Sequence, residues 1–192
     1  MHHRIKNNLQ TVAMLMQMQI FETDSQVARH ALETNIHRVQ SIASVHEVLS
    51  ERGFRLVDVK EVLEQITRMT SGSMVKPGQD IQISVTGQAL QLPSKAATAL
   101  ALVCNELVQN ALEHAFNDQG IGQINIALGH SAEEYIVLVR DNGQGFNENS
   151  HKGLGLEIAE TLVGEDLNGR MKYKHLPQGT EISIRFPRDK EQ

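Results

Sequence analysis

Apolar residues recur at helical spacing in two runs within the first fifty residues, on either side of residues 23–25. This pattern predicts two helices joined by a short turn. A hairpin of two helices cannot bury two apolar stripes by itself, so we expect two copies of the chain to pair as a four-helix bundle, which makes the protein a homodimer. The first stripe contains Ile5, Leu9, Val12, Met16 and Ile20, and the second contains Val27, Ala31, Ile36, Val39, Ile42 and Leu49.

The pattern changes after residue 50, where Glu51-Arg52-Gly53 interrupts the helical spacing. We therefore expect a domain joint at residues 50–54, with a helical domain over residues 1–52 and a second domain over residues 53–192. Asp58-Val59-Lys60-Glu61 is typical of a capping box and predicts a helix that runs to about residue 71. A further helix is predicted over residues 93–116, and strands are predicted over residues 80–86, 122–129, 134–140, 169–175 and 180–186.

The helix predicted over residues 93–116 carries the sequence Asn105-Glu106-Leu107-Val108-Gln109-Asn110-Ala111. Glu106 and Asn110 are four residues apart and therefore share one helical face. Their carboxylate and amide oxygens can converge on one hydrated cation, and Mg²⁺ needs few protein ligands because it keeps water and phosphate oxygens around it. A solvated polar stripe is the alternative interpretation, because polar pairs at this spacing are common on helices.

The strand predicted over residues 134–140 ends at Asp141-Asn142-Gly143-Gln144-Gly145. Gly143 and Gly145 can adopt backbone angles that are closed to other residues, and they let a ligand approach the main chain. The Asp141 carboxylate can accept a hydrogen bond from an exocyclic amine, so the arrangement favours recognition of a purine base. The alternative is an ordinary Asp-Asn-Gly turn between two hairpin strands.

Two further glycine motifs follow along the chain. Gly153-Leu154-Gly155-Leu156 precedes an apolar helical pattern, so its glycines are expected to open a helix whose exposed N–H groups favour phosphate. Gly179-Thr180 begins the last predicted strand. Four such motifs in one order indicate a site for ATP with Mg²⁺. The chain has neither the Gly-x-x-x-x-Gly-Lys-Ser/Thr motif of P-loop proteins nor the third glycine of a dinucleotide fingerprint.

These motifs and their order resemble those of the GHKL ATPase superfamily, which includes gyrase, heat-shock chaperones, histidine kinases and mismatch-repair ATPases. The resemblance covers roughly residues 54–187. It implies an α+β protein in which the two-helix hairpin precedes a GHKL (Bergerat) α/β sandwich. It also implies that Asn110 holds magnesium, that Asp141 binds the adenine amino group and that Thr180 supports the adenine side. The cofactor-binding set would be completed by Gly143, Gly145, Gly153, Gly155 and Leu156.

Two more residues of this region are candidates for a role in the site. Glu106 matches the position that orients attacking water in the hydrolases of the superfamily, which makes it a candidate catalytic residue here. Only residues 146–152 separate the second and third glycine motifs, so the lid of the site is expected to be short. Lys152 within this segment is a candidate phosphate contact, with a solvated surface lysine as the alternative.

The N-terminal sequence His2-His3-Arg4-Ile5-Lys6-Asn7 resembles the phosphoacceptor motif H-R-x-K-N of a subgroup of sensor histidine kinases related to the HWE kinases. The motif places the phosphoacceptor directly before Arg4, which selects His3 rather than His2. A neutral imidazole nitrogen can attack a phosphoryl group at physiological pH. The resemblance implies that His3 is autophosphorylated from ATP and passes its phosphoryl group to an aspartate in the receiver domain of a response regulator.

The surroundings of His3 leave several roles open. Many histidine kinases have an acidic residue directly after the phosphoacceptor, where this chain has Arg4. Either Glu47 or another group accepts the proton, or Arg4 pairs with the transferring phosphoryl group. If the hairpin turns near residue 24, His46 and Glu47 return to the level of His3. Asn7 follows His3 by one helical turn, where it either positions water in a phosphatase reaction or stabilises the helix start.

The composition excludes several other classes of protein. With 40% hydrophobic residues the chain can bury a core, and its net charge of -5 provides no broad basic field for nucleic acid. The single cysteine, Cys104, falls in an apolar helical stripe and is expected in the core. No run of eighteen apolar residues and no signal peptide occur. This part of the protein is therefore expected in the cytoplasm without membrane contact, whereas a longer parent could be membrane-anchored.

Two other functions fit part of the sequence. One is a GHKL ATPase that acts as a conformational clamp, in which Glu106 activates water, although the chain leaves little room for a transducer domain. The other is a phosphotransfer scaffold with a vestigial ATP site, which the intact nucleotide motifs disfavour. In the resembled kinases an input module precedes the phosphoacceptor motif, so we expect the chain to be the core of a longer protein with an upstream sensor domain.

Overall fold

The computed structural model describes residues 2–50, 56–116, 120–145 and 153–188 of the 192-residue chain. Contacts between residues divide the chain into two compact units, Met1–Gly53 and Phe54–Gln192. Most of the joint predicted at residues 50–54 lies outside the described residues. Each unit is a separate structural body with its own secondary structure.

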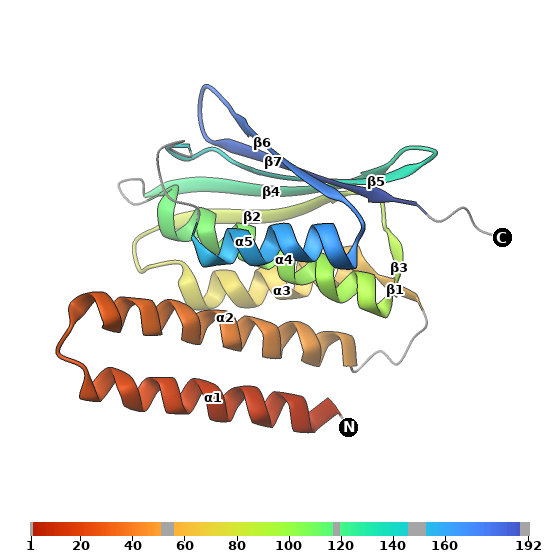
Figure 1. Ribbon diagram of the computed structural model, residues 1–192. Helices are drawn as coiled ribbons and strands as arrows, with labels where there is room; N and C mark the ends of the chain where they lie inside the picture. The colour runs from red at the N-terminus through yellow and green to blue at the C-terminus, as the bar shows by residue number, and fades with distance from the viewer. Residues whose placement is uncertain (1, 51–55, 117–119, 146–152, 189–192) are drawn as a thin grey trace. The chain divides into compact units, whose positions relative to one another are not determined.

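The first unit is a hairpin of two helices, α1 (His2–Glu22) and α2 (Gln26–Ser50) (Figure 1). The turn lies at residues 23–25, as the sequence predicts. The backbone N–H of Ala28 donates to Ser25 Oγ at 3.3 Å, so the serine hydroxyl caps the start of α2. Arg29 Nη2 closes the turn from the other side by donating to the carbonyl oxygen of Thr23 at 3.1 Å.

Several large apolar side chains of the hairpin are exposed in the single chain. Ala13 and Ile36 are buried, and Met16 is half-buried. The exposed side chains are those of Val12, Met14, Leu15, Met18, Phe21, Val27 and Ile42, with exposed fractions from 40% to 84%. One hairpin therefore leaves much of its apolar surface in water, and exposed apolar surface of this kind marks a site of association.

The second unit contains a five-stranded sheet with the order β2-β4-β5-β7-β6. The pair β2 and β4 is parallel, and the other neighbouring pairs are antiparallel. All five strands predicted from the sequence are confirmed. They are β2 (Asp80–Gly87), β4 (Ile121–His130), β5 (Glu134–Asp141), β6 (Arg170–His175) and β7 (Thr180–Pro187).

Helices cover one face of this sheet (Figure 1). They are α3 (Val59–Met74), α4 (Ser94–His114) and α5 (Leu154–Thr161), which runs on into the π-helical turn η1 (Leu162–Asp166). Buried and less buried residues alternate along β4, where Ile124, Ile126 and Leu128 turn toward the core. Leu100 and Val108 of α4 are fully buried. The predicted α+β architecture, a helical hairpin followed by an α/β sandwich, is confirmed.

The predicted start of α3 is also present. Asp58 is the N-cap residue, and its Oδ1 accepts from the backbone N–H groups of Lys60 at 2.9 Å and Glu61 at 3.4 Å. The sequence analysis missed three short elements: β1 (Leu56–Asp58), its antiparallel partner β3 (Gln91–Pro93), and η1. Elements of three to five residues are too short to show a period in the hydrophobic pattern.

Candidate nucleotide-binding site

Asp141 occupies the last position of β5 and joins two of the glycine motifs. Its Oδ1 accepts from the backbone N–H of Gly143 at 2.9 Å, and its Oδ2 accepts from the backbone N–H of Thr180 at 3.3 Å. Thr180 is the first residue of β7, the neighbour of β5 in the sheet. The alternative of a simple hairpin turn is wrong, because β5 pairs with β4 and β7, and neither strand begins directly after Asp141.

The Asp141 carboxyl group is buried, with 9% of the residue exposed. Burial raises the pKa of this carboxyl above its ordinary value, and the hydrogen bonds from the N–H groups of Gly143 and Thr180 oppose the rise. The folded state therefore binds this proton more tightly than the unfolded chain does. The stabilisation of the folded state by this tighter proton binding is present below the ordinary aspartate pKa. It is lost as the pH rises through the raised pKa of Asp141. Above that raised pKa the ionised group costs stability, as is typical of binding sites.

Two of the glycines are required by close contacts with the main chain. A Cβ atom at Gly143 would overlap the carbonyl oxygen of Ala115, the residue that follows α4. A Cβ atom at Gly179 would overlap the carbonyl oxygen of Asp141, and Gly179 also has a φ of 85°, in the left-handed region. The backbone around Asp141 is therefore packed directly against the end of α4 and the turn before β7.

The segment after Asp141 is fixed to its neighbours by further hydrogen bonds. Asn142 Oδ1 accepts from the backbone N–H of Gln123 at 2.7 Å, and the N–H of Asn142 donates to the Gln123 carbonyl oxygen at 3.2 Å. The N–H of Gln144 donates to the carbonyl oxygen of Ala115 at 3.0 Å. Asn110 precedes Ala115 by five residues, which is about 7.5 Å along a helix axis. The first and second motifs are thus brought close together.

The side-chain amide of Asn110 on α4 is a further polar group of this region. Within the described residues its Nδ2 is buried and has no hydrogen-bond partner. A buried amide group without a partner is unfavourable, and an oxygen of a bound phosphate or water would satisfy it. A half-turn of the amide presents its oxygen instead, which is a ligand that Mg²⁺ accepts. Glu106, one turn earlier on the same face, is half-buried.

A neighbouring asparagine that the sequence analysis did not single out has a structural role. Asn105 is buried on α4, and its Oδ1 accepts from the hydroxyl of Thr70 on α3 at 2.7 Å. This bond ties the two helices together beneath the site. No sequence signal identifies it, because its partner lies 35 residues away.

The third motif opens α5 as predicted. Gly153 is the N-cap residue, and its carbonyl oxygen accepts from the backbone N–H of Leu156 at 3.0 Å. Gly155 and Leu156 are buried, whereas a Cβ atom at Gly153 would meet nothing within 4 Å. The predicted lid at residues 146–152, with Lys152, lies outside the described residues. Gly145 has a φ of 83° at the edge of that segment.

The residues predicted to carry phosphotransfer lie in the hairpin. His3 and Arg4 are in the first turn of α1, and their side chains lie outside the described part of the chain. Asn7 is exposed, and its carbonyl oxygen accepts from Thr11 Oγ1 at 2.9 Å. His46 is half-buried near the end of α2. None of the described helices is long and apolar enough to cross a membrane.

The geometry in the second unit fits a purine nucleotide. The buried Asp141 carboxylate has lone pairs beyond the two that accept from backbone N–H groups, so it can take a further bond from an exocyclic amine. Asn110 Nδ2, which is buried and has no partner among the described residues, is a further polar group available to a ligand. No group of three or more His, Cys, Asp or Glu residues among those described could hold a metal. Asn110 together with phosphate and water fits the sparse protein ligation of Mg²⁺.

Comparison with known proteins identifies the family. Residues 1–74 match a family described as histidine kinase, and residues 95–190 match one described as histidine kinase-, DNA gyrase B- and HSP90-like ATPase. The sensor histidine kinase PdtaS of Mycobacterium tuberculosis is 38% identical over 192 residues, which cover 97% of this chain and 38% of that protein. The chain belongs to the sensor histidine kinases.

Other relatives of this histidine kinase agree. The blue-light-activated histidine kinase of Rhizobium johnstonii is 26% identical, over 96% of this chain and 51% of that protein. The histidine kinase domain of the Erythrobacter litoralis EL346 blue-light-activated kinase has the same fold, with a TM-score of 0.70 at 23% identity over 97% of this chain and 88% of that one. This kinase chain spans 38% of the length of PdtaS and about half that of the Rhizobium protein.

The contact at Gly143 generates a prediction for this kinase. Gly143→Ala is expected to lower the free energy of unfolding by about 1–3 kcal/mol, because the added methyl overlaps the Ala115 carbonyl oxygen and displaces the N–H that Asp141 binds. Gly164→Ala is the matched control, since a Cβ atom there meets nothing within 4 Å. Urea denaturation measures both variants. Equal stabilities would contradict the packing of the Asp141 segment against α4.

Proposed function

We propose that this chain is the catalytic core of a two-component histidine kinase that phosphorylates its own His3 from ATP and passes the phosphoryl group to an aspartate of a response regulator. The observation that carries the proposal is the Asp141 carboxylate, buried and held by the N–H groups of Gly143 and Thr180, together with Asn110 Nδ2 on α4, which is buried and has no partner among the described residues. The histidine kinase match over residues 1–74 contains the His3 motif and supports the acceptor assignment.

In this proposal each of the nucleotide-binding residues has a separate role. Asp141 accepts a hydrogen bond from the adenine amino group, and Thr180 fixes the carboxylate that does so. Asn110 would hold magnesium, which would offset the negative charge of the phosphate groups. Gly143, Gly145, Gly153, Gly155 and Leu156 shape the site, and Lys152 contacts phosphate.

The phosphotransfer step belongs to His3. A ring nitrogen attacks the γ-phosphorus of ATP, so that a nitrogen–phosphorus bond forms while the bond to the bridging oxygen of ADP breaks. The remaining ring N–H proton then passes to Glu47 or to water. Because phosphoryl transfer depends chiefly on positioning and charge neutralisation, Arg4 beside His3 stabilises the transferring group. Glu106 orients the reacting groups at the phosphate end of the site.

The hairpin also provides the assembly and the partner surface in this proposal. The exposed apolar side chains of α1 and α2 pair with those of a second copy, giving a homodimer built on a four-helix bundle. A receiver domain approaches the end that carries His3, and an upstream sensor domain in a longer parent controls the reaction. This core works in the cytoplasm, where ATP is available.

The nucleotide residues can be tested by titration calorimetry. Asp141→Ala is expected to weaken ADP binding by about 10–100-fold, because a charge-assisted hydrogen bond to the base is lost. Asn110→Ala is expected to leave ADP binding without metal largely intact and to weaken ATP binding in the presence of Mg²⁺. Glu181→Ala, on the neighbouring position of β7, is the matched control. Unchanged ADP affinity in Asp141→Ala would refute the site.

The phosphoacceptor can be tested with γ-labelled ATP. The chain is expected to gain an acid-labile, base-stable phosphate on His3, so His3→Gln abolishes labelling and leaves ADP affinity unchanged. His2→Gln is the matched control and labels normally. Labelling that persists in His3→Gln would move the acceptor to His2 or His46. ATP hydrolysis without any labelled residue would favour the conformational clamp.

The same labelling assay, with a receiver domain added, tests the role of Asn7. Asn7→Ala is expected to label normally but to lengthen the lifetime of the phosphorylated partner, because the amide positions the attacking water. Asn8→Ala, also exposed on the next position of α1, is the matched control. An unchanged lifetime would leave Asn7 a structural residue.

Assembly can be tested by light scattering. A fragment of residues 53–192 is expected to be monomeric and to bind ADP, because the dimer contact lies in the hairpin. In the intact chain Met18→Glu is expected to dissociate the dimer, whereas Gln17→Glu adds the same charge at an exposed polar position and leaves the dimer intact. A dimeric fragment would place the interface in the ATP-binding domain.

A further inference from the structure

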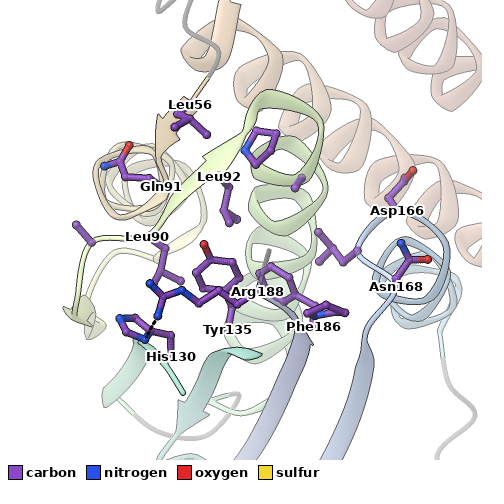
Figure 2. A pocket seen from close by; sticks show the side chains of 15 residues that line it. Leu56, Leu90, Gln91, Leu92, His130, Tyr135, Asp166, Asn168, Phe186 and Arg188 are labelled. Carbon is purple, nitrogen blue, oxygen red and sulfur yellow. Dashed lines mark hydrogen bonds between the residues drawn. The ribbon is translucent and has the colours of Figure 1, made fainter. Parts of the chain in front are cut away.

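A cavity lies in the ATP-binding domain, at the end of the sheet opposite to Asp141. It has a volume of about 530 Å³, within the range of small-molecule sites. Its walls come from β1, β3, the start of β5, the end of β7 and the first turn of α4 (Figure 2). Tyr135 of β5 lies six residues before Asp141, which corresponds to about 20 Å along a strand. The cavity is therefore separate from the nucleotide residues.

The floor of this cavity is apolar and well packed. Leu90, Leu92, Leu167 and Phe186 line it and are at most 5% exposed. The rings of Tyr135 and Phe186 lie against each other, with centroids 5.2 Å apart and planes inclined by 37°. Apolar side chains that are held in place on several elements form a preformed surface for the body of a ligand.

One side of the cavity carries a cationic group, Arg188. Its guanidinium carbon lies 6.0 Å from the centroid of the Tyr135 ring, and Nη1 contacts His130 Nδ1 at 2.8 Å (Figure 2). Since an arginine N–H only donates, Nδ1 of His130 is the acceptor. The tyrosine face and the imidazole thus hold the guanidinium beside the cavity.

The described partners of the Arg188 guanidinium are uncharged groups. Among the described residues no carboxylate forms an ion pair with it. Arg188 Nη1 donates to His130 Nδ1 and, at 3.4 Å, to the carbonyl oxygen of Ser131. Asp166, the acidic residue of the cavity lining, pairs with Lys95 at 2.7 Å. The Nε and Nη2 groups of this guanidinium have no partner among the described residues. A planar guanidinium of this kind beside an apolar floor matches a planar anion such as a carboxylate.

We propose that this cavity is a second ligand site, which binds a small organic anion with an apolar body and one carboxylate. The apolar body packs on Leu90, Leu92 and Phe186, and the carboxylate pairs with Arg188. The site stands independently of phosphotransfer by His3. The elements that it shares with the nucleotide residues include β5, β7 and α4, the last of which runs about 20 Å from Ala96 at the cavity to Asn110.

The probe for this site is 1-naphthoate, with neutral 1-naphthylmethanol as its uncharged counterpart. The chain has no tryptophan, so the fluorescence of the naphthalene ring can be followed directly on the intact protein. We expect 1-naphthoate to bind with a dissociation constant below about 1 mM, and at least about tenfold more tightly than the alcohol. Saturating ADP with Mg²⁺ is expected to leave the naphthoate titration unchanged.

Three variants locate the site. Arg188→Met keeps a long apolar side chain and is expected to weaken naphthoate about tenfold while leaving the alcohol unaffected. Arg140→Met, at an exposed position of β5, is the matched control and should change neither titration. Ala96→Phe places a ring into the cavity from α4 and is expected to weaken both probes, with thermal unfolding used to verify that it folds.

Several outcomes would overturn the proposal. Equal affinities for naphthoate and the alcohol would show that no anion is recognised. Unchanged naphthoate binding in Arg188→Met would place the anion elsewhere, and displacement by ADP would place it in the nucleotide site. Absence of naphthoate binding up to about 10 mM would show that the cavity is not a site for this class of ligand.

Discussion

The contact between the Asp141 carboxylate and two backbone N–H groups determines the geometry of the nucleotide end of the molecule. Gly143 belongs to the segment after β5, and Thr180 begins β7, so one side chain ties the end of β5 both to the segment that follows it and to the start of β7. Gly143 and Gly179 are required beside this carboxylate. The carbonyl oxygen of Ala115 occupies the space that a Cβ atom at Gly143 would need, and that of Asp141 occupies the space that a Cβ atom at Gly179 would need. Burial of the carboxylate raises its pKa and disfavours its charged form. The folded protein accepts that cost at a position where a ligand amine would offset it.

The two ends of the sheet have different chemistry. At the end with Asp141 and Thr180, polar groups and closely packed glycines favour a nucleotide. At the other end, Tyr135 and Phe186 face an apolar cavity with Arg188 beside it. Both ends are built on the same strands and on α4. A ligand in the cavity would therefore contact elements that also carry Asn110 and Asp141, without touching either residue.

The hairpin obeys a different constraint from the sandwich. Its helices bury small and branched side chains such as Ala13 and Ile36, yet Met14, Met18 and Phe21 face water. A two-helix unit has too little interior for the apolar residues that its sequence carries. The sandwich, with helices against a five-stranded sheet, encloses its core within one chain. This difference is the physical basis of the proposed association of two hairpins.

The sequence by itself determined the helices, the five long strands and the residues of the glycine motifs, because periodicity, caps and turn residues act over a few neighbouring positions. It identified Asp141 and Asn110 as candidates for the same reason. Only the tertiary structure decided that Asp141 binds Thr180 across 39 residues, that Asn105 joins α4 to Thr70, and that Leu92, Tyr135 and Arg188 line one cavity. These contacts join residues that are far apart along the chain, and no local pattern of apolar and polar positions records which distant surfaces meet.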